Sequence, residues 1–179
     1  EEFRALLNSE GLQHVRTYIQ SGNILFESSK SAQTLRQQIE NMISKNYGFD
    51  VTTIVKTPDQ LKKIIQENPY FGNPEKDDTR TYFTLLSKTP EPTLAEALDK
   101  LHYPPEEAVL HGDVLYFYSP LGYGDAKMNN NFFEKKLKVD ATTRNWKTMT
   151  RSFCSAKMSA SKVASSMLPK ACKRNLAKS

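Results

Sequence analysis

Hydrophobic residues recur along the chain with two periods, one typical of helices and one typical of strands. Residues 31–45 carry apolar side chains at helical spacing, from Leu35 to Ile43, and Ser31 precedes them as a predicted N-cap. The same two periods predict the other elements of the first half. A helix ends before Gly11, and a hairpin over 15–26 is broken at Ser21-Gly22-Asn23. After the helix over 31–45 come a strand over 51–56 and a helix that begins at Thr57 and Pro58.

The second half predicts a strand, a helix, two strands, a helix and a strand in that order. The predicted elements are a strand over 80–87, a helix over 93–101, a hairpin across Gly112 and Asp113, a helix from Asn129 or Asn130, and an extended piece over 141–146. This order is the split β-α-β, ferredoxin-like unit. The first half has the same order if one strand precedes Glu1. The sequence therefore predicts an α+β fold of two ferredoxin-like subdomains with mostly antiparallel sheets, the first subdomain lacking its first strand.

Changes in composition divide the chain into three segments. Residues 68–79 are rich in Pro, Gly, Asn and Asp and indicate a boundary, which predicts subdomains over 1–72 and 73–150. Residues 151–179 are rich in Ser and Ala and contain Pro169, so we expect disorder or a frayed helix there.

The net charge of +5 comes from this last segment. Residues 151–179 hold seven basic and no acidic side chains, and residues 1–150 carry a net charge of −2. A basic tail predicts a weak, nonspecific attraction to nucleic acid, whereas the slightly acidic body gives no such signal.

Composition excludes several classes of protein. With 38% hydrophobic residues the chain can form a core, and no apolar run reaches the length of a membrane span. Cys154 and Cys172 make neither a disulfide framework nor a zinc pattern, and the three histidines are scattered. We therefore expect a cytoplasmic protein with no metal, no cofactor and no membrane partner. Because the chain begins at Glu1 inside a helical pattern, we also expect an N-terminal truncation.

The segment over 122–139, GYGDAKMNNNFFEKKLKV, carries the first candidate chemistry. Lys127 lies just before a helix whose first backbone N–H groups can bind an anion, and Arg144 follows on the next segment. The alternative is structural, with glycines that end a strand, an Asn that caps the helix and a solvated Lys127. The spacing does not match a Walker A loop.

Two further motifs contain polar residues that suit a binding site. Trp146, beside Arg144 and Asn145, could stack on a base or sugar, or could anchor the core. Ser21 and Asn23 could present a hydroxyl and an amide at a strand break, or simply form a turn. No catalytic residue is identified, because the acidic residues form no dyad and Ser21 has no positioned base.

Three motifs in order, VRTYIQSGNILFES (15–28), GYGDAKMNNNFFEKKLKV (122–139) and ATTRNWKT (141–148), resemble the domain-of-unknown-function 1697 family. The resemblance implies an intracellular α+β protein of two subdomains, with no established activity. It also implies that an opening strand and a Gly-rich loop are missing here, and that the basic tail departs from the family pattern.

The leading functional hypothesis is a binding protein for a small phosphate- or carboxylate-bearing ligand, held in a cleft between the subdomains. One alternative is a nucleic-acid-binding α+β module, and another is an enzyme whose site needs the missing loop. The candidate ligand-binding residues are Ser21, Asn23, Lys127, Asn130, Arg144, Asn145 and Trp146.

Overall fold

The computed structural model describes residues 2–18, 22–157 and 162–166, which form two compact units. The first unit contains residues 1–62 and 151–179, and the second contains residues 63–150. The sequence predicted the boundary after residue 72. The division falls earlier because Asn68 and Tyr70 are buried in the second unit, where the Tyr70 ring packs against Tyr118 at 5.8 Å.

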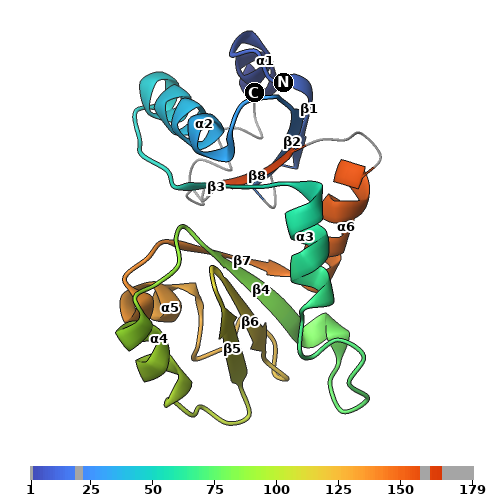
Figure 1. Cartoon of the computed structure of the whole chain (residues 1–179), viewed down its shortest axis with the longest axis vertical. Coiled ribbons are helices and arrows are strands. Elements are labelled where there is room, and N and C mark those ends of the chain that lie inside the picture. The colour runs from blue at the N-terminus through green and yellow to red at the C-terminus, as the bar shows by residue number, and fades with distance from the viewer. Residues whose placement is uncertain (1, 19–21, 158–161, 167–179) are drawn as a thin grey trace. The chain divides into compact units, whose positions relative to one another are not determined.

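The first unit is a four-stranded antiparallel sheet with two helices of its own (Figure 1). The strand order is β1-β2-β8-β3. Its elements are α1 (Glu2–Ser9), β1 (Gln13–Tyr18), β2 (Asn23–Glu27), α2 (Ala32–Tyr47), β3 (Thr53–Lys56) and β8 (Lys162–Ser166), and it shares α3 (Pro58–Gln66) and α6 (Trp146–Lys157) with the second unit.

Local signals account for the helices of this unit. The Ser31 hydroxyl accepts a hydrogen bond from the Thr34 N–H and starts α2, and Gly48 ends the helix in the left-handed region at φ 72°. The apolar face of α2, centred on Leu35 and Ile39, packs with Phe26 of β2 in the core of this unit.

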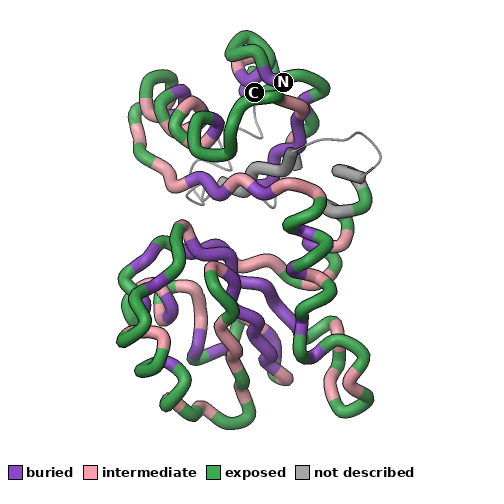
Figure 2. The backbone as a smooth tube through the Cα atoms, in the orientation of Figure 1, coloured by how far each residue is buried: buried purple, intermediate pink, exposed green. Residues whose placement is uncertain are grey.

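The second unit is also a four-stranded antiparallel sheet, with the order β5-β6-β4-β7. Figure 2 shows β4 and β6 as nearly continuous buried strands, with Phe83, Leu115 and Phe117 fully enclosed. Phe117 packs with Phe133 in the core under the helices. The elements are a 3-10 turn (Asp78–Arg80), β4 (Thr81–Leu86), α4 (Pro92–Asp99), β5 (Glu107–His111), β6 (Val114–Tyr118), α5 (Asn130–Leu137) and β7 (Ala141–Asn145).

The two sheets share one topology, and this confirms the predicted α+β fold class. In each sheet the order is second, third, first and fourth strand of a β-α-β-β-α-β unit. In the second unit β4 takes the first-strand position. In the first unit that position is filled by β8, which pairs antiparallel with both β2 and β3.

Part of the C-terminal segment, where we expected disorder or a frayed helix, has regular structure. Residues 151–157 continue α6, and Lys162–Ser166 form β8 at the centre of the first sheet, whereas residues 158–161 and 167–179 lie outside the described residues. The local sequence of β8, KVASS, is a poor strand former, so pairing partners on both sides decide its conformation.

Candidate functional site

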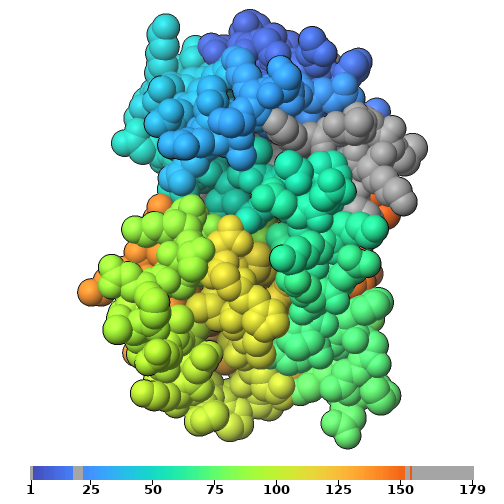
Figure 3. Space-filling view, viewed as in Figure 1, coloured from blue at the N-terminus to red at the C-terminus, as the bar shows by residue number. Residues whose placement is uncertain are grey.

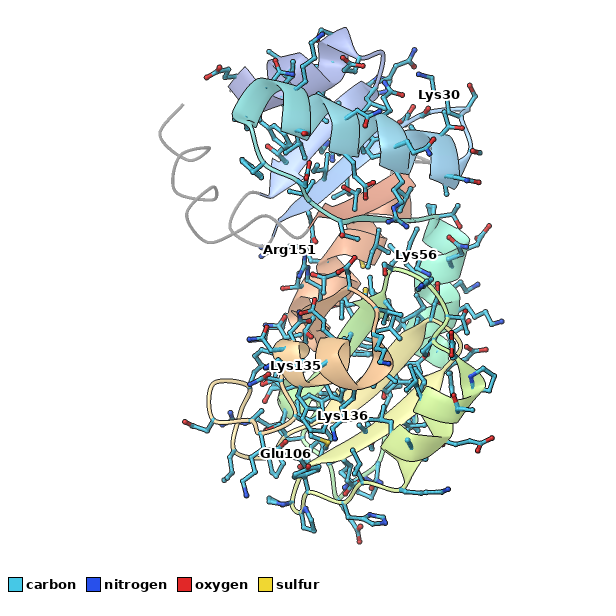
Figure 4. The ribbon with its side chains drawn as sticks, turned by 90° about the vertical axis from the view of Figure 1, so that its left-hand side faces the viewer. Lys30, Lys56, Glu106, Lys135, Lys136 and Arg151 are labelled. Carbon is cyan, nitrogen blue, oxygen red and sulfur yellow. The ribbon has the colours of Figure 1, made fainter. Side chains whose placement is uncertain are left out.

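The loop that leads into α5 binds the carboxylate of Glu106, a residue of the same chain. The backbone N–H groups of Lys127 and Met128 each donate to one oxygen of Glu106, both at 2.8 Å. Figure 4 shows Glu106 beside this loop. The Lys127 side chain is exposed. Glu106 therefore occupies the two amides that the sequence offered to an external anion, and the ligand-binding role of Lys127 stays a prediction.

Gly122 shapes the same loop. Its φ of 98° lies in the left-handed region, and a Cβ at this position would lie 2.7 Å from a guanidinium nitrogen of Arg80. The Gly122 N–H donates to the Ser119 carbonyl at 3.0 Å, which turns the chain from β6 toward α5. The turn and the close packing against Arg80 therefore account for a glycine at position 122 without any ligand.

Asn130 ties the start of α5 to β7. Its side-chain N–H donates to the Ala141 carbonyl at 2.9 Å, and its side-chain oxygen accepts from the Thr143 hydroxyl at 3.2 Å. Thr143 has one hydroxyl proton, so Thr84, 2.8 Å away, is then the donor to Thr143. The Asn130 backbone N–H donates to the Tyr123 hydroxyl at 2.9 Å. Asn130 is thus a positioning residue between helix and sheet.

Arg144 brings a positive charge to this network. Its Nη1 donates to the Thr142 hydroxyl at 2.6 Å and to the Thr143 carbonyl at 2.9 Å, which are uncharged acceptors on its own strand. Burial lowers the pKa of the Arg144 guanidinium to about 10, and the Tyr123 phenol opposes this shift. Burial also raises the pKa of Tyr123, against the lowering effect of its hydrogen-bonding contacts with the Thr143 side chain and the Asn130 backbone. The positive charge of Arg144 is therefore held where the surroundings disfavour it.

Asn145 and Trp146 have structural contacts at the start of α6. The Asn145 side-chain oxygen accepts from the Thr148 N–H at 2.8 Å, as an N-cap does. The Trp146 ring stacks on Phe71 at 4.7 Å and on Phe83 at 5.8 Å between ring centroids. These contacts fit the anchoring interpretation of Trp146, whose flanking ring Phe71 is 52% exposed.

The other two predicted residues belong elsewhere. Ser21 lies outside the described residues, and Asn23 is buried at the start of β2 in the first unit, paired with Tyr18 and Ser165. The structure thus brings Asn130 and Arg144 together through Thr143, within the second unit. The cleft between subdomains stays a prediction.

Sequence reasoning missed two members of this region. The sequence gives no reason to single out Glu106, which follows Pro104 and Pro105, or Tyr123, which lies between two glycines. Neither has a local signal for its role, because the partners of Glu106 lie 21 and 22 residues away along the chain.

The described residues hold neither a metal-ion cluster nor a membrane-spanning helix. No group of three or more His, Cys, Asp or Glu side chains is arranged to hold a metal ion in this part of the chain. Within the same residues no helix has the length and apolar character needed to cross a bilayer.

Comparisons with known proteins give a family and a fold. A family model described as a protein of unknown function (DUF1697) matches residues 1–116. The chain is also similar to the structure of a conserved bacterial protein from Streptococcus pneumoniae, with a TM-score of 0.65, 20% identity and 87% of each chain covered. No curated protein matches the chain. The family match ends within β6, so the resemblance of the motifs over 122–139 and 141–148 stays a prediction.

Proposed function

Because the chain belongs to DUF1697, a family of unknown function, we propose a function from its own residues: it binds a small anionic ligand through Arg144, at the edge of the second sheet. The ligand class is a phosphate- or carboxylate-bearing small molecule. The observation that carries the proposal is the half-buried guanidinium of Arg144, positioned by a hydroxyl and a carbonyl.

The electrostatics of Arg144 favour an anion. A guanidinium whose pKa is lowered by burial holds its charge at a free-energy cost, and a bound anion offsets that cost. Arginine also presents a planar fork of donors that matches phosphate and carboxylate oxygens. The strand β7 lies at the edge of its sheet, where one side has no neighbouring strand among the described residues.

The surrounding segment has the matching charge. Residues 122–147 contain six Lys or Arg side chains and three acidic ones. Lys135 and Lys136 lie on α5 in Figure 4, and both are exposed. In the proposal, Lys127 supplies a second cation from its exposed position, and Asn130 keeps Thr143 and the strand beside Arg144 in place. Asn145 and Trp146 would border the ligand from the start of α6.

Titration of the full chain with inorganic pyrophosphate and with citrate tests the proposal. Two-dimensional amide NMR follows residues 122–147, and calorimetry measures the affinity. Arg144→Gln is expected to weaken binding about tenfold or more, as the loss of a charge-assisted hydrogen bond does. Lys127→Gln is expected to weaken it less, because an exposed lysine contributes less.

Lys135→Gln is the matched control, since it removes the same charge from an exposed position on α5. If Lys135→Gln weakens binding as much as Arg144→Gln, the attraction is general and the proposed site is wrong. Absence of any response in the wild-type chain to either anion also rejects it. Arg144→Lys keeps the charge and loses the fork, so it should bind with intermediate affinity.

A further inference from the structure

The second unit contains a cavity of about 400 Å³ between α4, the loop that follows it and β5. Its wall includes Tyr70, Tyr103 and Met128. In the space-filling view, the yellow-green atoms around α4 and the yellow atoms around β5 lie side by side with green atoms of the segment after α3 (Figure 3). The volume lies within the range of small-molecule sites.

The charges on the cavity wall are mostly negative. Asp99, Glu106 and Glu107 line it, and His102 is the sole basic residue among the lining residues. Glu106 is held rigidly, since each of its oxygens accepts a backbone N–H, from Lys127 and from Met128. Each of these oxygens retains a second lone pair for another donor. A fixed carboxylate in a partly apolar cavity favours a cation.

The chain already places one ammonium group against this wall. Lys76 forms an ion pair with Glu107, and its Nζ lies 4.5 Å from the Tyr118 ring centroid and 5.8 Å from that of Tyr70. The Lys76 side chain is only 16% exposed. The carboxylate of Glu107 and the face of Tyr70 therefore bind an amine in this environment.

Tyr70 supplies a second, independent observation. It is 4% exposed, and its buried hydroxyl makes no hydrogen bond within the described residues. Burial, and then the charge of Glu107, raise the pKa of Tyr70, so the hydroxyl remains protonated, and its oxygen can accept a hydrogen bond from an ammonium group. A buried polar group without a partner costs free energy, which a ligand atom can recover.

We propose that this cavity binds a small organic cation, an ammonium group on an apolar body, with the ammonium beside Glu106, Asp99 and the Tyr70 hydroxyl oxygen and the body against Tyr103. The inference uses none of the residues that define the proposed anion site, apart from the backbone amides that hold Glu106. The cation site can therefore be tested independently of the anion site.

The test compares phenethylammonium with 2-phenylethanol, a neutral molecule of similar shape, on the full chain by amide NMR. Phenethylammonium is expected to shift the amide resonances of Lys127 and Met128 and to bind at least about fivefold more tightly than the alcohol. Equal affinities for the two molecules would mean a merely apolar cavity and would overturn the proposal, as would the absence of any shift.

Two variants sharpen the result. Asp99→Asn should weaken phenethylammonium about threefold, and the fold should tolerate it because a negative charge at the end of α4 opposes the helix dipole. Tyr70→Phe should weaken it about fivefold and leave the free protein at least as stable, since an unpartnered hydroxyl is removed.

Glu91→Gln is the control, because it removes the same charge at the other end of α4, where Glu91 makes no side-chain cap hydrogen bond. Its affinity for phenethylammonium should equal that of the wild type. If Glu91→Gln and Asp99→Asn weaken binding equally, the effect is general electrostatics and the cavity site is rejected.

Discussion

The two sheets have the same strand order, but they acquire their first-position strand from different parts of the chain. In the second unit that strand is β4, which directly precedes α4 and β5. In the first unit it is β8, which comes more than 100 residues after β3. Every residue of β4 is buried, with Phe83 and two leucines among them, whereas β8 reads KVASS.

This difference shows that one sheet topology can be completed by local or by distant sequence. Strands that pair over a long separation must overcome a larger loop-closure entropy, and they form later in folding. The second unit is continuous over residues 63–150, and side chains such as Asn130 and Glu134 join its helix to its sheet. The first unit depends on backbone pairing from the C-terminal segment.

The basic C-terminal segment also has a structural role in the first unit. Lys162 lies in β8, so the segment that carries the positive charge also contributes to the first sheet. Deletion of residues 151–179 would therefore remove a central strand together with the charge. A test of nucleic-acid attraction needs Lys→Gln substitutions and a salt titration in the full chain.

Proline in the two equivalent strands should have the largest effect. Ala164 pairs with Ile24 on one side and Val55 on the other, so Ala164→Pro removes ladder hydrogen bonds at the centre of the sheet. We expect a loss of about 3 kcal/mol or more, confined to the first unit. Amide hydrogen exchange should show β2 and β3 losing protection while β4 and β6 keep it.

The reciprocal variant Thr84→Pro acts on β4, which pairs with β6 and β7. It should reverse the pattern of protection. Full protection of β2 and β3 in Ala164→Pro would show that β8 does not complete the first sheet.

Alkaline pH should weaken the second unit through Tyr116. Burial, and then the charges of Glu67 and Asp113, raise the pKa of Tyr116 to about 12. The unfolded chain releases this proton near pH 10, so its contribution is constant below pH 10 and stability falls between about pH 10 and 12. Tyr116→Phe should lose less stability over this range, by about 2–3 kcal/mol at pH 12.

Urea unfolding followed by the fluorescence of Trp146, which stacks on Phe83 in the same unit, measures this difference. Arg144, whose pKa is lowered to about 10, acts in the opposite direction but equally in both proteins. Parallel stability curves for Tyr116→Phe and the wild type above pH 10 would contradict the prediction.

Asn130→Ala should destabilise the second unit by about 2 kcal/mol, because it breaks two part-buried hydrogen bonds between the Asn130 side chain and β7. The neighbouring residue Asn131 is exposed, and Asn131→Ala should change stability by less than about 0.5 kcal/mol. Denaturant unfolding of both variants gives the comparison. Equal values would show that Asn130 does not fasten α5 to the sheet.

The smallest effect is expected at Asp77, in the loop before β4. Its carboxylate accepts hydrogen bonds from the Thr79 hydroxyl and backbone N–H, which lower its pKa. This contribution is present above pH 4 or so, the ordinary carboxyl range, and is lost as pH falls through the lowered value. The melting temperature of the second unit should therefore fall slightly less at acid pH in Asp77→Asn than in the wild type. Asp78→Asn, the same change one residue later, serves as its control.

Much of the fold was predictable because its signals are local. The Ser31 cap, Gly48 and the Asn129 cap delimit α2 and α5 within one or two residues of the predicted ends. Alternating β-branched and aromatic residues identified the strands of both sheets except β8. The N–H groups before α5 donate to the Glu106 carboxylate, which agrees with the general need of exposed amides at a helix start for a partner. The binding of an external anion by Lys127 stays a prediction.

The sequence by itself therefore determined the α+β class, the order of the elements and the caps. The tertiary structure decided which distant groups meet. Only the folded chain places β8 between β2 and β3, Glu106 on the amides of Lys127 and Met128, and Asn130 against β7. Caps and periodicity act over a few residues, whereas strand pairing and buried hydrogen bonds join residues whose separation along the chain leaves no local pattern.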